Sequence, residues 1–184
     1  MRVNLPAAIE EHQKIMTGIL ALEPLIANVI SCIRSTFERG GILYICGNGG
    51  SATDAQHFAA EFTGRFERDR KGYPAISLTN DTAALTAIGN DYGFERIFSR
   101  QLESLANNKD LLLLISTSGN SQNLINAAQQ AKQQQITTIG LLGRDGGQLA
   151  KSIDYPLIVP GERTSRIQES HIFILHFICE AFER

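Results

Sequence analysis

The sequence predicts an α/β fold: a three-layer sandwich around a mostly parallel five-stranded sheet, with extra helices at the N-terminus. Short, continuous apolar runs recur along the chain, as in strands buried on both faces of a parallel sheet. Helix-compatible segments separate these runs, and such alternation implies crossover connections between parallel strands. We expect one domain over residues 1–184, because a chain of 184 residues can bury its apolar surface around one core.

Residues 1–40 are expected to form two N-terminal helices. The second carries an apolar stripe with i, i+3, i+4, i+7 and i+11 spacing, made by Ile26, Val29, Ile30, Ile33 and Phe37. Pro24 stands where a first-turn proline belongs. Periodicity leaves open whether these helices cover the sheet or pack against a partner subunit.

The α/β core is expected over residues 41–184. Strands are predicted at residues 42–46, 75–78, 111–116, 136–142 and 155–159. Helices are predicted at residues 52–63, 82–88, 97–105, 122–135, 148–152 and 166–182. The last helix is apolar almost all round, so we expect it to be buried, partly against another chain.

Composition argues against two kinds of partner. The chain has 17 Lys and Arg against 19 Asp and Glu, whereas proteins that bind nucleic acid through phosphate charge are usually basic. The densest apolar run, residues 172–179, is too short for a bilayer and contains His176, so no membrane partner is expected. The first residues lack a signal-peptide apolar region, and the 3 cysteines favour a reducing cytoplasm.

Two predicted strand ends are rich in glycine and small hydroxyl residues, and ligands of open parallel sheets bind at such ends. Residues 46–51 and residues 116–121 each precede a helix and offer backbone N–H groups and hydroxyls, which suit an anion. The first segment could equally be a helix cap. The second has more hydroxyls than one cap needs, which favours phosphate. Neither segment matches a nucleotide motif, so we expect a small phosphorylated metabolite.

His57 and Glu61 lie four residues apart on a predicted helix, which places both on one face. They could share a metal or act as a base and its orienting partner, although exposed pairs of this kind are common. His176 lies in an apolar helix, where a histidine is ordinarily a core residue. Gln168 is about 12 Å of helix rise away from it, which permits a shared site without arguing for one.

Asn90 and Asp91 are flanked by glycine, a pattern typical of a turn, with a contact to sugar hydroxyls as the second interpretation. Arg65 is either a solvated arginine or a substrate contact.

Six segments of the chain form a recognisable set. In chain order they are Cys-Gly-Asn-Gly-Gly-Ser, His-Phe-Ala-Ala-Glu-Phe-Thr-Gly-Arg, Ile-Gly-Asn-Asp-Tyr-Gly-Phe, Ile-Ser-Thr-Ser-Gly-Asn-Ser, Gly-Arg-Asp-Gly-Gly and Arg-Ile-Gln-Glu-Ser-His. Together they resemble the sedoheptulose 7-phosphate isomerases, or phosphoheptose isomerases, of the sugar isomerase (SIS) domain superfamily. The resemblance implies conversion of this ketose to D-glycero-D-manno-heptose 7-phosphate through an enediol, an early step toward nucleotide-activated heptose for lipopolysaccharide. It also implies a cytoplasmic homotetramer with active sites at subunit interfaces and one Zn²⁺ per subunit.

The resemblance further implies roles for individual residues. The zinc ligands would be His57, Glu61, Gln168 and His176. Glu61 and His176 would also be the catalytic acid/base pair. The phosphate would be held by Ser116, Thr117, Ser118 and Ser121. The other substrate contacts would be Asn48, Gly49, Gly50, Ser51, Arg65, Asn90 and Asp91, together with Glu61 and Gln168.

The alternative is a non-catalytic SIS-domain relative that binds the bacterial replication initiator. That relative lacks the acid at the position of Glu61 and the histidine at the position of His176, and this chain has both. The sequence therefore favours an enzyme.

Overall fold

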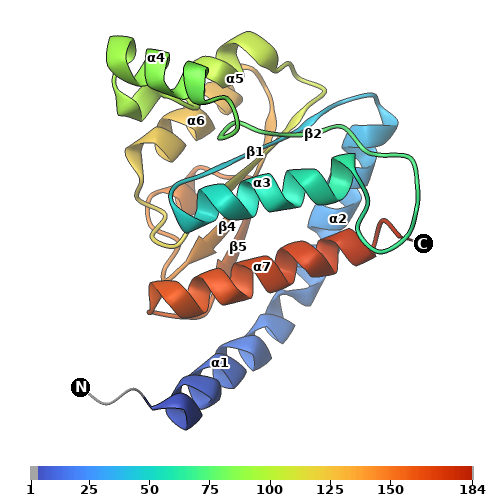
Figure 1. Cartoon of the computed structure of the whole chain (residues 1–184), viewed down its shortest axis with the longest axis vertical. Helices are drawn as coiled ribbons and strands as arrows, with labels where there is room; N and C mark the ends of the chain where they lie inside the picture. The colour runs from blue at the N-terminus through green and yellow to red at the C-terminus, as the bar shows by residue number, and fades with distance from the viewer. Residues whose placement is uncertain (1–3, 184) are drawn as a thin grey trace.

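The computed structural model describes residues 4–183 and shows a five-stranded sheet with helices on both faces (Figure 1). The strands are β1 (Leu43–Gly47), β2 (Ala75–Ser77), β3 (Leu111–Ser116), β4 (Thr137–Gly143) and β5 (Tyr155–Val159). Their order is β2-β1-β3-β4-β5, and the four pairings between them are parallel. The predicted fold class is confirmed.

The α-helices follow the predicted order with small shifts at their ends. They are α1 (Leu5–Ile19), α2 (Glu23–Glu38), α3 (Gly50–Thr63), α4 (Thr82–Tyr92), α5 (Ser99–Leu105), α6 (Gln122–Gln133) and α7 (Thr164–Glu180). Short 3₁₀ turns are η1 (Leu20–Leu22), η2 (Phe94–Arg96) and η3 (Leu149–Lys151). The helix predicted at residues 148–152 is therefore only η3, because the chain must enter β5 a few residues later.

The prediction of a turn at Asn90 and Asp91 was wrong. Helix α4 begins at the N-cap Asp81, whose side chain accepts a hydrogen bond from the Ala84 N–H at 2.9 Å, and it continues through both residues. It ends only at Gly93, its C-terminal cap. Asn90 and Asp91 thus lie exposed in the last helical turn.

Alternate residues of the central strands point into two separate hydrophobic clusters. Leu111, Leu113 and Ile115 of β3 face a cluster that contains buried residues of α1, α2, α3 and α7. Leu112 and Leu114 face a second cluster, which is formed with α5 and α6. This period of two places one helical layer on each face of the sheet and builds the three-layer sandwich.

Helices α3 and α7 run side by side across one face of the sheet (Figure 1). Aromatic rings join the end of α3 to the chain that follows α7: the Phe62 ring lies 5.1 Å from that of Phe182 and, within α3, 4.9 Å from that of Phe58. The largely buried Arg70 adds polar links, because its guanidinium donates to the Glu61 carbonyl at 2.8 Å and to the Glu183 carboxylate at 2.9 Å. The end of α3 is thereby tied to the chain that follows α7.

The N-terminal helical run over residues 5–38 is more apolar than the sequence analysis allowed. By length and composition alone, this run could cross a membrane, and only 22% of its most apolar window is buried. Its inner face nevertheless packs into the core through Ile15, Ile26 and Val29. Its outer face includes Leu20, which is 70% exposed. The run is therefore a core helix pair with an uncovered apolar side.

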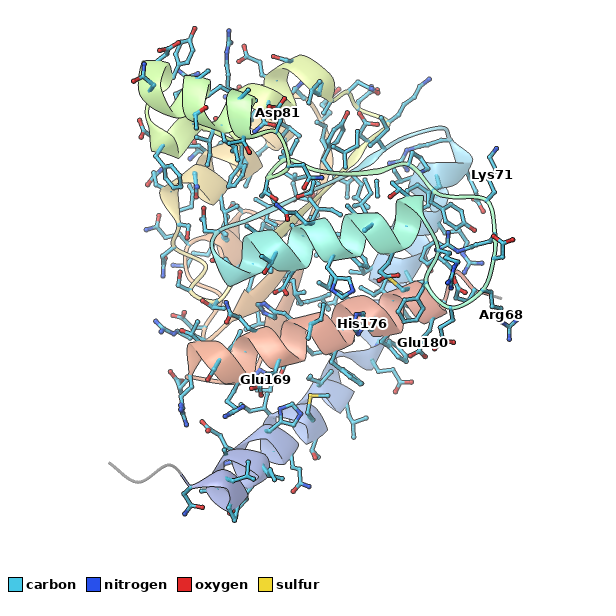
Figure 2. All side chains as sticks on the ribbon, in the orientation of Figure 1. Arg68, Lys71, Asp81, Glu169, His176 and Glu180 are labelled. Atoms are coloured by element: carbon cyan, nitrogen blue, oxygen red, sulfur yellow. The ribbon has the colours of Figure 1, made fainter. Side chains whose placement is uncertain are left out.

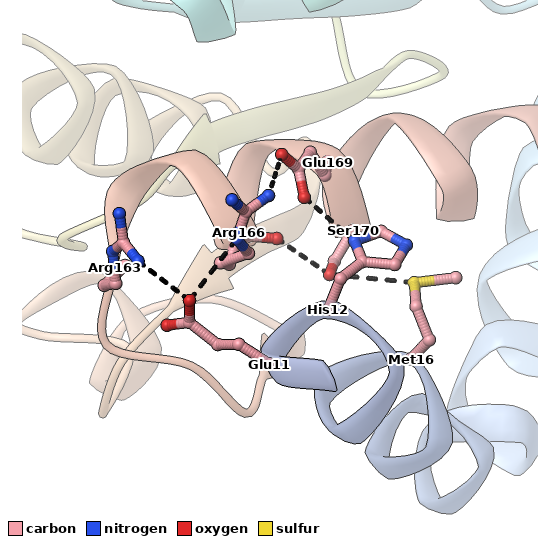
Figure 3. A network of polar contacts seen from close by, with 7 residues as sticks. All are labelled: Glu11, His12, Met16, Arg163, Arg166, Glu169 and Ser170. Atoms are coloured by element: carbon pink, nitrogen blue, oxygen red, sulfur yellow. Dashed lines mark hydrogen bonds and ion pairs between the residues drawn. The ribbon is translucent and has the colours of Figure 1, made fainter. Parts of the chain in front are cut away.

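A polar network joins α1 to the first turns of α7 (Figure 3). Glu11 accepts a hydrogen bond from Arg163 at 2.9 Å and lies 3.4 Å from Arg166. Glu169 pairs with Arg166 and, at 2.8 Å, with the Nδ1 atom of His12. This network orients the end of α7 that carries Gln168.

His171 is a buried polar residue on the inner face of α7. Its side chain is 0% exposed, and among residues 4–183 neither ring nitrogen has a hydrogen-bond partner of good geometry. Burial lowers the pKa of His171 to about 4, with only partial opposition from the Leu142 backbone. The folded protein therefore keeps this imidazole neutral near pH 7.

A neutral, buried His171 makes stability fall with acid. The unfolded chain takes up a proton near pH 6.5 and the folded chain only near pH 4, so stability is lost as pH falls through that window. At pH 5 this loss is about 2 kcal/mol. A His171→Phe variant lacks this loss. Between pH 7 and pH 5, its free energy of unfolding, measured by urea denaturation, should therefore fall by about 2 kcal/mol less than that of the wild type. Parallel profiles for the two proteins, or a His171 ring that titrates by NMR near pH 6.5, would contradict the assignment.

Candidate functional site

The predicted site residues gather at the carboxyl edge of the sheet and along the adjoining helices α3 and α7. The segment of residues 48–51 covers the link from β1 to α3 and the first two residues of α3, and the segment of residues 116–121 covers the last residue of β3 and the link to α6. Because β1 and β3 are neighbouring parallel strands, their carboxyl ends place these two loops side by side. His176 lies on α7 on the side that faces α3 (Figure 2).

His57, Glu61 and His176 converge between the two helices. The Nε2 atom of His57 lies 3.0 Å from a carboxylate oxygen of Glu61 and 3.5 Å from the Nε2 atom of His176. The two imidazole rings are 5.1 Å apart, and the Phe66 ring lies 5.6 Å from that of His176. Glu61 is the more enclosed partner, with 21% of its side chain exposed against 47% for His57. The structure thus joins residues that are 119 positions apart in sequence.

The chemistry of these three side chains suits a metal ion such as zinc. Two ligands bound to one tetrahedral zinc lie roughly 3.3 Å apart, and the two separations that involve His57 Nε2 are 3.0 and 3.5 Å. Within residues 4–183, no three His, Cys, Asp or Glu side chains already stand in a complete metal-binding arrangement. The three side chains therefore suit zinc in kind, and the two separations at His57 Nε2 suit it in spacing.

Gln168 lies beside the loop of residues 48–51. A Cβ atom on Gly50 would come within 2.4 Å of the Gln168 side-chain nitrogen, so the Gln168 amide lies directly against this backbone. The structure therefore places Gln168 against the N-terminus of α3, two turns along that helix from His57, and does not join it to the cluster of His57, Glu61 and His176.

Hydroxyl groups shape the loop of residues 116–121. The Ser116 hydroxyl accepts a hydrogen bond from the Gly119 N–H at 3.0 Å, and the Ser118 hydroxyl accepts one from the Asn120 N–H at 3.2 Å. Ser121 is the N-cap of α6, yet its side chain makes no capping bond. Its hydroxyl and the first N–H groups of α6 are therefore placed to bind an anion.

A second glycine-rich loop packs against residues 116–121. Gly119 has a φ of +64°, and a Cβ there would lie 1.9 Å from the Gly146 carbonyl oxygen. The Gly119 carbonyl accepts a hydrogen bond from the Leu149 N–H at 3.0 Å, and the Asn120 side chain accepts one from the Gln148 N–H at 3.0 Å. The Gly-Arg-Asp-Gly-Gly segment thus serves as backbone support for the hydroxyl loop.

The remaining predicted substrate contacts differ in their burial and in their position relative to the two loops. Ser51 is buried, with 3% of its surface exposed. The Arg65 side chain is exposed and reaches the Glu67 carbonyl at 3.4 Å. Asn90 donates to Asp91 at 2.8 Å, and among the described residues neither side chain forms a hydrogen bond with the two loops. Thr117 is half-buried beside Ser116, as a member of the hydroxyl loop should be.

Two polar residues near the site were missed by sequence reasoning. Asp54 is half-buried one turn before His57, and one of its carboxylate oxygens has no partner among residues 4–183. Burial raises the pKa of Asp54, and His57 opposes this effect. Asn123 is 3% exposed and bonds to the Asn48 side chain. Its position two residues after Ser121 was the available sequence signal.

The matching family model and the similar proteins all point to one family. A family model described as the SIS domain matches residues 9–143. A phosphoheptose isomerase from Helicobacter hepaticus is 53% identical over 183 residues, which span 100% of this chain and 93% of that protein. Phosphoheptose isomerase 1 from Campylobacter jejuni is 50% identical over 174 residues, or 95% of this chain and 94% of that protein.

The fold agrees with a solved structure. That of a phosphoheptose isomerase from Neisseria gonorrhoeae superimposes with a TM-score of 0.92 at 42% identity, and the match covers 97% of this chain and 96% of that one. The similarity therefore extends over both loops and over α3 and α7.

Proposed function

We propose a residue-level mechanism from one premise: the chain belongs to the phosphoheptose isomerases, enzymes built on the SIS domain. It is accordingly an enzyme of heptose biosynthesis that isomerises sedoheptulose 7-phosphate. The observation that carries the mechanism is the convergence of His57, Glu61 and His176 beside the two ligand loops.

The phosphate end of the substrate binds the hydroxyl loop in this proposal. Ser116, Thr117, Ser118 and Ser121 surround the N-terminus of α6, where backbone N–H groups and the helix dipole favour an anion. Residues 116–121 include no lysine or arginine. Phosphate recognition by this loop therefore depends on hydrogen bonds from neutral groups.

Glu61 and His176 carry out the proton transfers at the other end of the sugar. Glu61 removes a proton from C1 of the ketose while His176 protonates the oxygen on C2, which gives an enediol. Glu61 then returns its proton to C2, and His176 takes the proton from the oxygen on C1, which becomes the aldehyde. The two residues end in their starting states, so the isomerisation balances without an external oxidant or reductant.

We also propose that His57, Glu61, Gln168 and His176 hold one zinc ion per chain. When bound, zinc would supply Lewis-acid polarisation of the substrate oxygen. The support is the donor chemistry and the separations of 3.0 and 3.5 Å around His57.

We propose a homotetramer with active sites completed at subunit interfaces, and the uncovered apolar surface of the N-terminal helices supports association of the chains. A groove of about 460 Å³ runs between α1, α2 and α7 and includes Leu20, Phe173 and Phe177. Phe173 and Phe177 are 46% and 42% exposed in the single chain. A second copy of the chain would remove this surface from water, as is usual for large apolar patches. We also propose that the protein is located in the cytoplasm.

Replacement of the carboxylate by an amide tests the proposed base. Purified protein incubated with sedoheptulose 7-phosphate should form the heptose 7-phosphate, and Glu61→Gln should lower turnover roughly 10²–10⁴-fold because an amide cannot accept the proton. Glu103→Gln is the matched control, since Glu103 is an exposed residue of α5 paired with Arg100. Full activity of the Glu61 variant would rule out its role as the base.

Metal analysis tests the proposed ligands independently of activity. The wild type should retain about one zinc per chain after dialysis, measured by elemental analysis, and His57→Ala should lose most of it. His12→Ala is the control, because His12 also pairs with a glutamate, at 2.8 Å, but lies on α1. Equal zinc retention in the two variants would exclude His57 as a ligand.

Sedimentation velocity tests the assembly. The wild type should sediment as a particle of four times the 20.2 kDa chain mass. Phe173→Asp should shift the population toward smaller species because a charge in the groove opposes its burial. Leu105→Asp alters an equally exposed apolar residue outside the groove and should leave the assembly intact. A monomeric wild type would contradict the proposal.

A further inference from the structure

The side chains of Asn48 and Asn123 form a reciprocal amide pair. The Asn48 nitrogen donates to the Asn123 oxygen at 2.9 Å, and the Asn123 nitrogen donates to the Asn48 oxygen at 2.8 Å. The two residues are 75 positions apart in sequence. Asn123 is 3% exposed, so the pair is anchored in the interior.

This arrangement fixes the orientation of both amides. Each side chain is donor and acceptor at once, so rotation of either amide would place two donors and two acceptors against each other. Because Asn123 is buried, a lost bond would leave a desolvated polar group without a partner, which is costly. The pair is therefore a rigid link rather than a casual surface contact.

The link joins the two loops of the site. Asn48 begins the loop of residues 48–51, in which Gly50 packs against Gln168. Asn123 lies in the first turn of α6, two residues after Ser121. The neighbouring strands β1 and β3 set the coarse separation of the loops, since Gly47 pairs with Ile115. Beyond the strand ends, the amide pair is what connects the loops through side chains.

The pairing also changes what Asn48 can offer a ligand. The carboxamide predicted to contact the sugar is engaged by Asn123 through both its oxygen and its nitrogen. The loop therefore presents chiefly its backbone at the exposed Gly49 and Gly50, and the place of that backbone depends on the pair.

We infer that Asn123 is a positioning residue of the isomerase. Through Asn48, it holds the sugar loop at a fixed place relative to the phosphate loop, so that a substrate bound by its phosphate presents C1 and C2 correctly to Glu61 and His176. The inference rests on the proposed function. It predicts a defect in turnover with little change in phosphate affinity, because the hydroxyl loop has its own support from residues 146–149.

Asn123→Asp is the sharpest test. The carboxylate keeps the volume and still accepts from Asn48, but it cannot donate, and its oxygen faces the Asn48 oxygen. We expect kcat for sedoheptulose 7-phosphate to fall about 10- to 100-fold, as misplacement of a reacting group by about 1 Å can cause. In Asn123→Ala, which adds no charge beside the hydroxyl loop, the inhibition constant of inorganic phosphate should change less than about threefold, since phosphate reports on the hydroxyl loop alone.

Asn126→Asp is the matched control. Asn126 lies one turn further along α6, is partly buried, and donates to the Glu95 carbonyl at 2.9 Å rather than to the sugar loop. Its kcat should stay within about threefold of the wild type's. Thermal unfolding of each variant separates a folding defect from a catalytic one. Should Asn123→Asp fail to fold, Asn48→Asp disrupts the same pair from its less buried side.

A double-mutant cycle with alanine distinguishes a link from two separate contacts. If Asn123 acts through Asn48, each single substitution should lower kcat/KM similarly, and the double variant should be no worse than either. Additive losses, or wild-type kcat in a folded Asn123→Asp protein, would overturn the inference. An inactive wild-type enzyme would instead refute the proposed function, which keeps the two failures apart.

Discussion

The packing of α3 against α7 is the contact on which the candidate site depends. His57 and Glu61 belong to one helix and His176 to the other, so any sliding of the helices would separate the proposed base from the proposed acid. The rings of Phe62 and Phe182, 5.1 Å apart, fill the space between the helix ends. Burial of such aromatic pairs is among the stronger stabilising terms in a core. The geometry of the proposed acid/base pair thus depends on the hydrophobic core.

The two ligand loops obey a different constraint, because loops beyond strand ends have no ladder of hydrogen bonds. Backbone contacts near Gly119 hold the hydroxyl loop, and the amide pair of Asn48 and Asn123 connects it to the sugar loop. Close backbone approach requires glycine at such positions, which explains why the site is rich in that residue. The same choice leaves few side chains to bind substrate, so hydroxyls and N–H groups must carry recognition. A net charge of −2 is compatible with the proposed binding of phosphate by neutral groups.

Local patterns in the sequence predict the strands and most helices, since apolar runs and i, i+4 stripes involve neighbouring residues. The prediction fails at residues 90–91, where the glycines that flank the pair suggest a turn although α4 continues to Gly93. Four-residue spacing places His57 beside Glu61, and the structure confirms that contact at 3.0 Å. The approach of His176, 119 positions away, follows from family resemblance rather than from spacing. The position of Asn123 two residues after Ser121 places it near the hydroxyl loop, but its bond to Asn48, 75 positions away, leaves no periodic trace in the sequence.

Helix α7 shows why an apolar pattern alone cannot separate a core from an interface. At 3.6 residues per turn, successive side chains point about 100° apart, so one helix presents several distinct faces. Ile174 and Ile178 are buried in the core, His176 faces α3, and Phe173 and Phe177 remain over 40% exposed. In sequence these apolar residues look alike, and only the packing tells them apart. Since Phe177 directly follows His176, a partner chain that covered the exposed face would also border the acid/base pair. Assembly and catalysis would then share one helix, and burial of the outer face would shield the proton-transfer site from water.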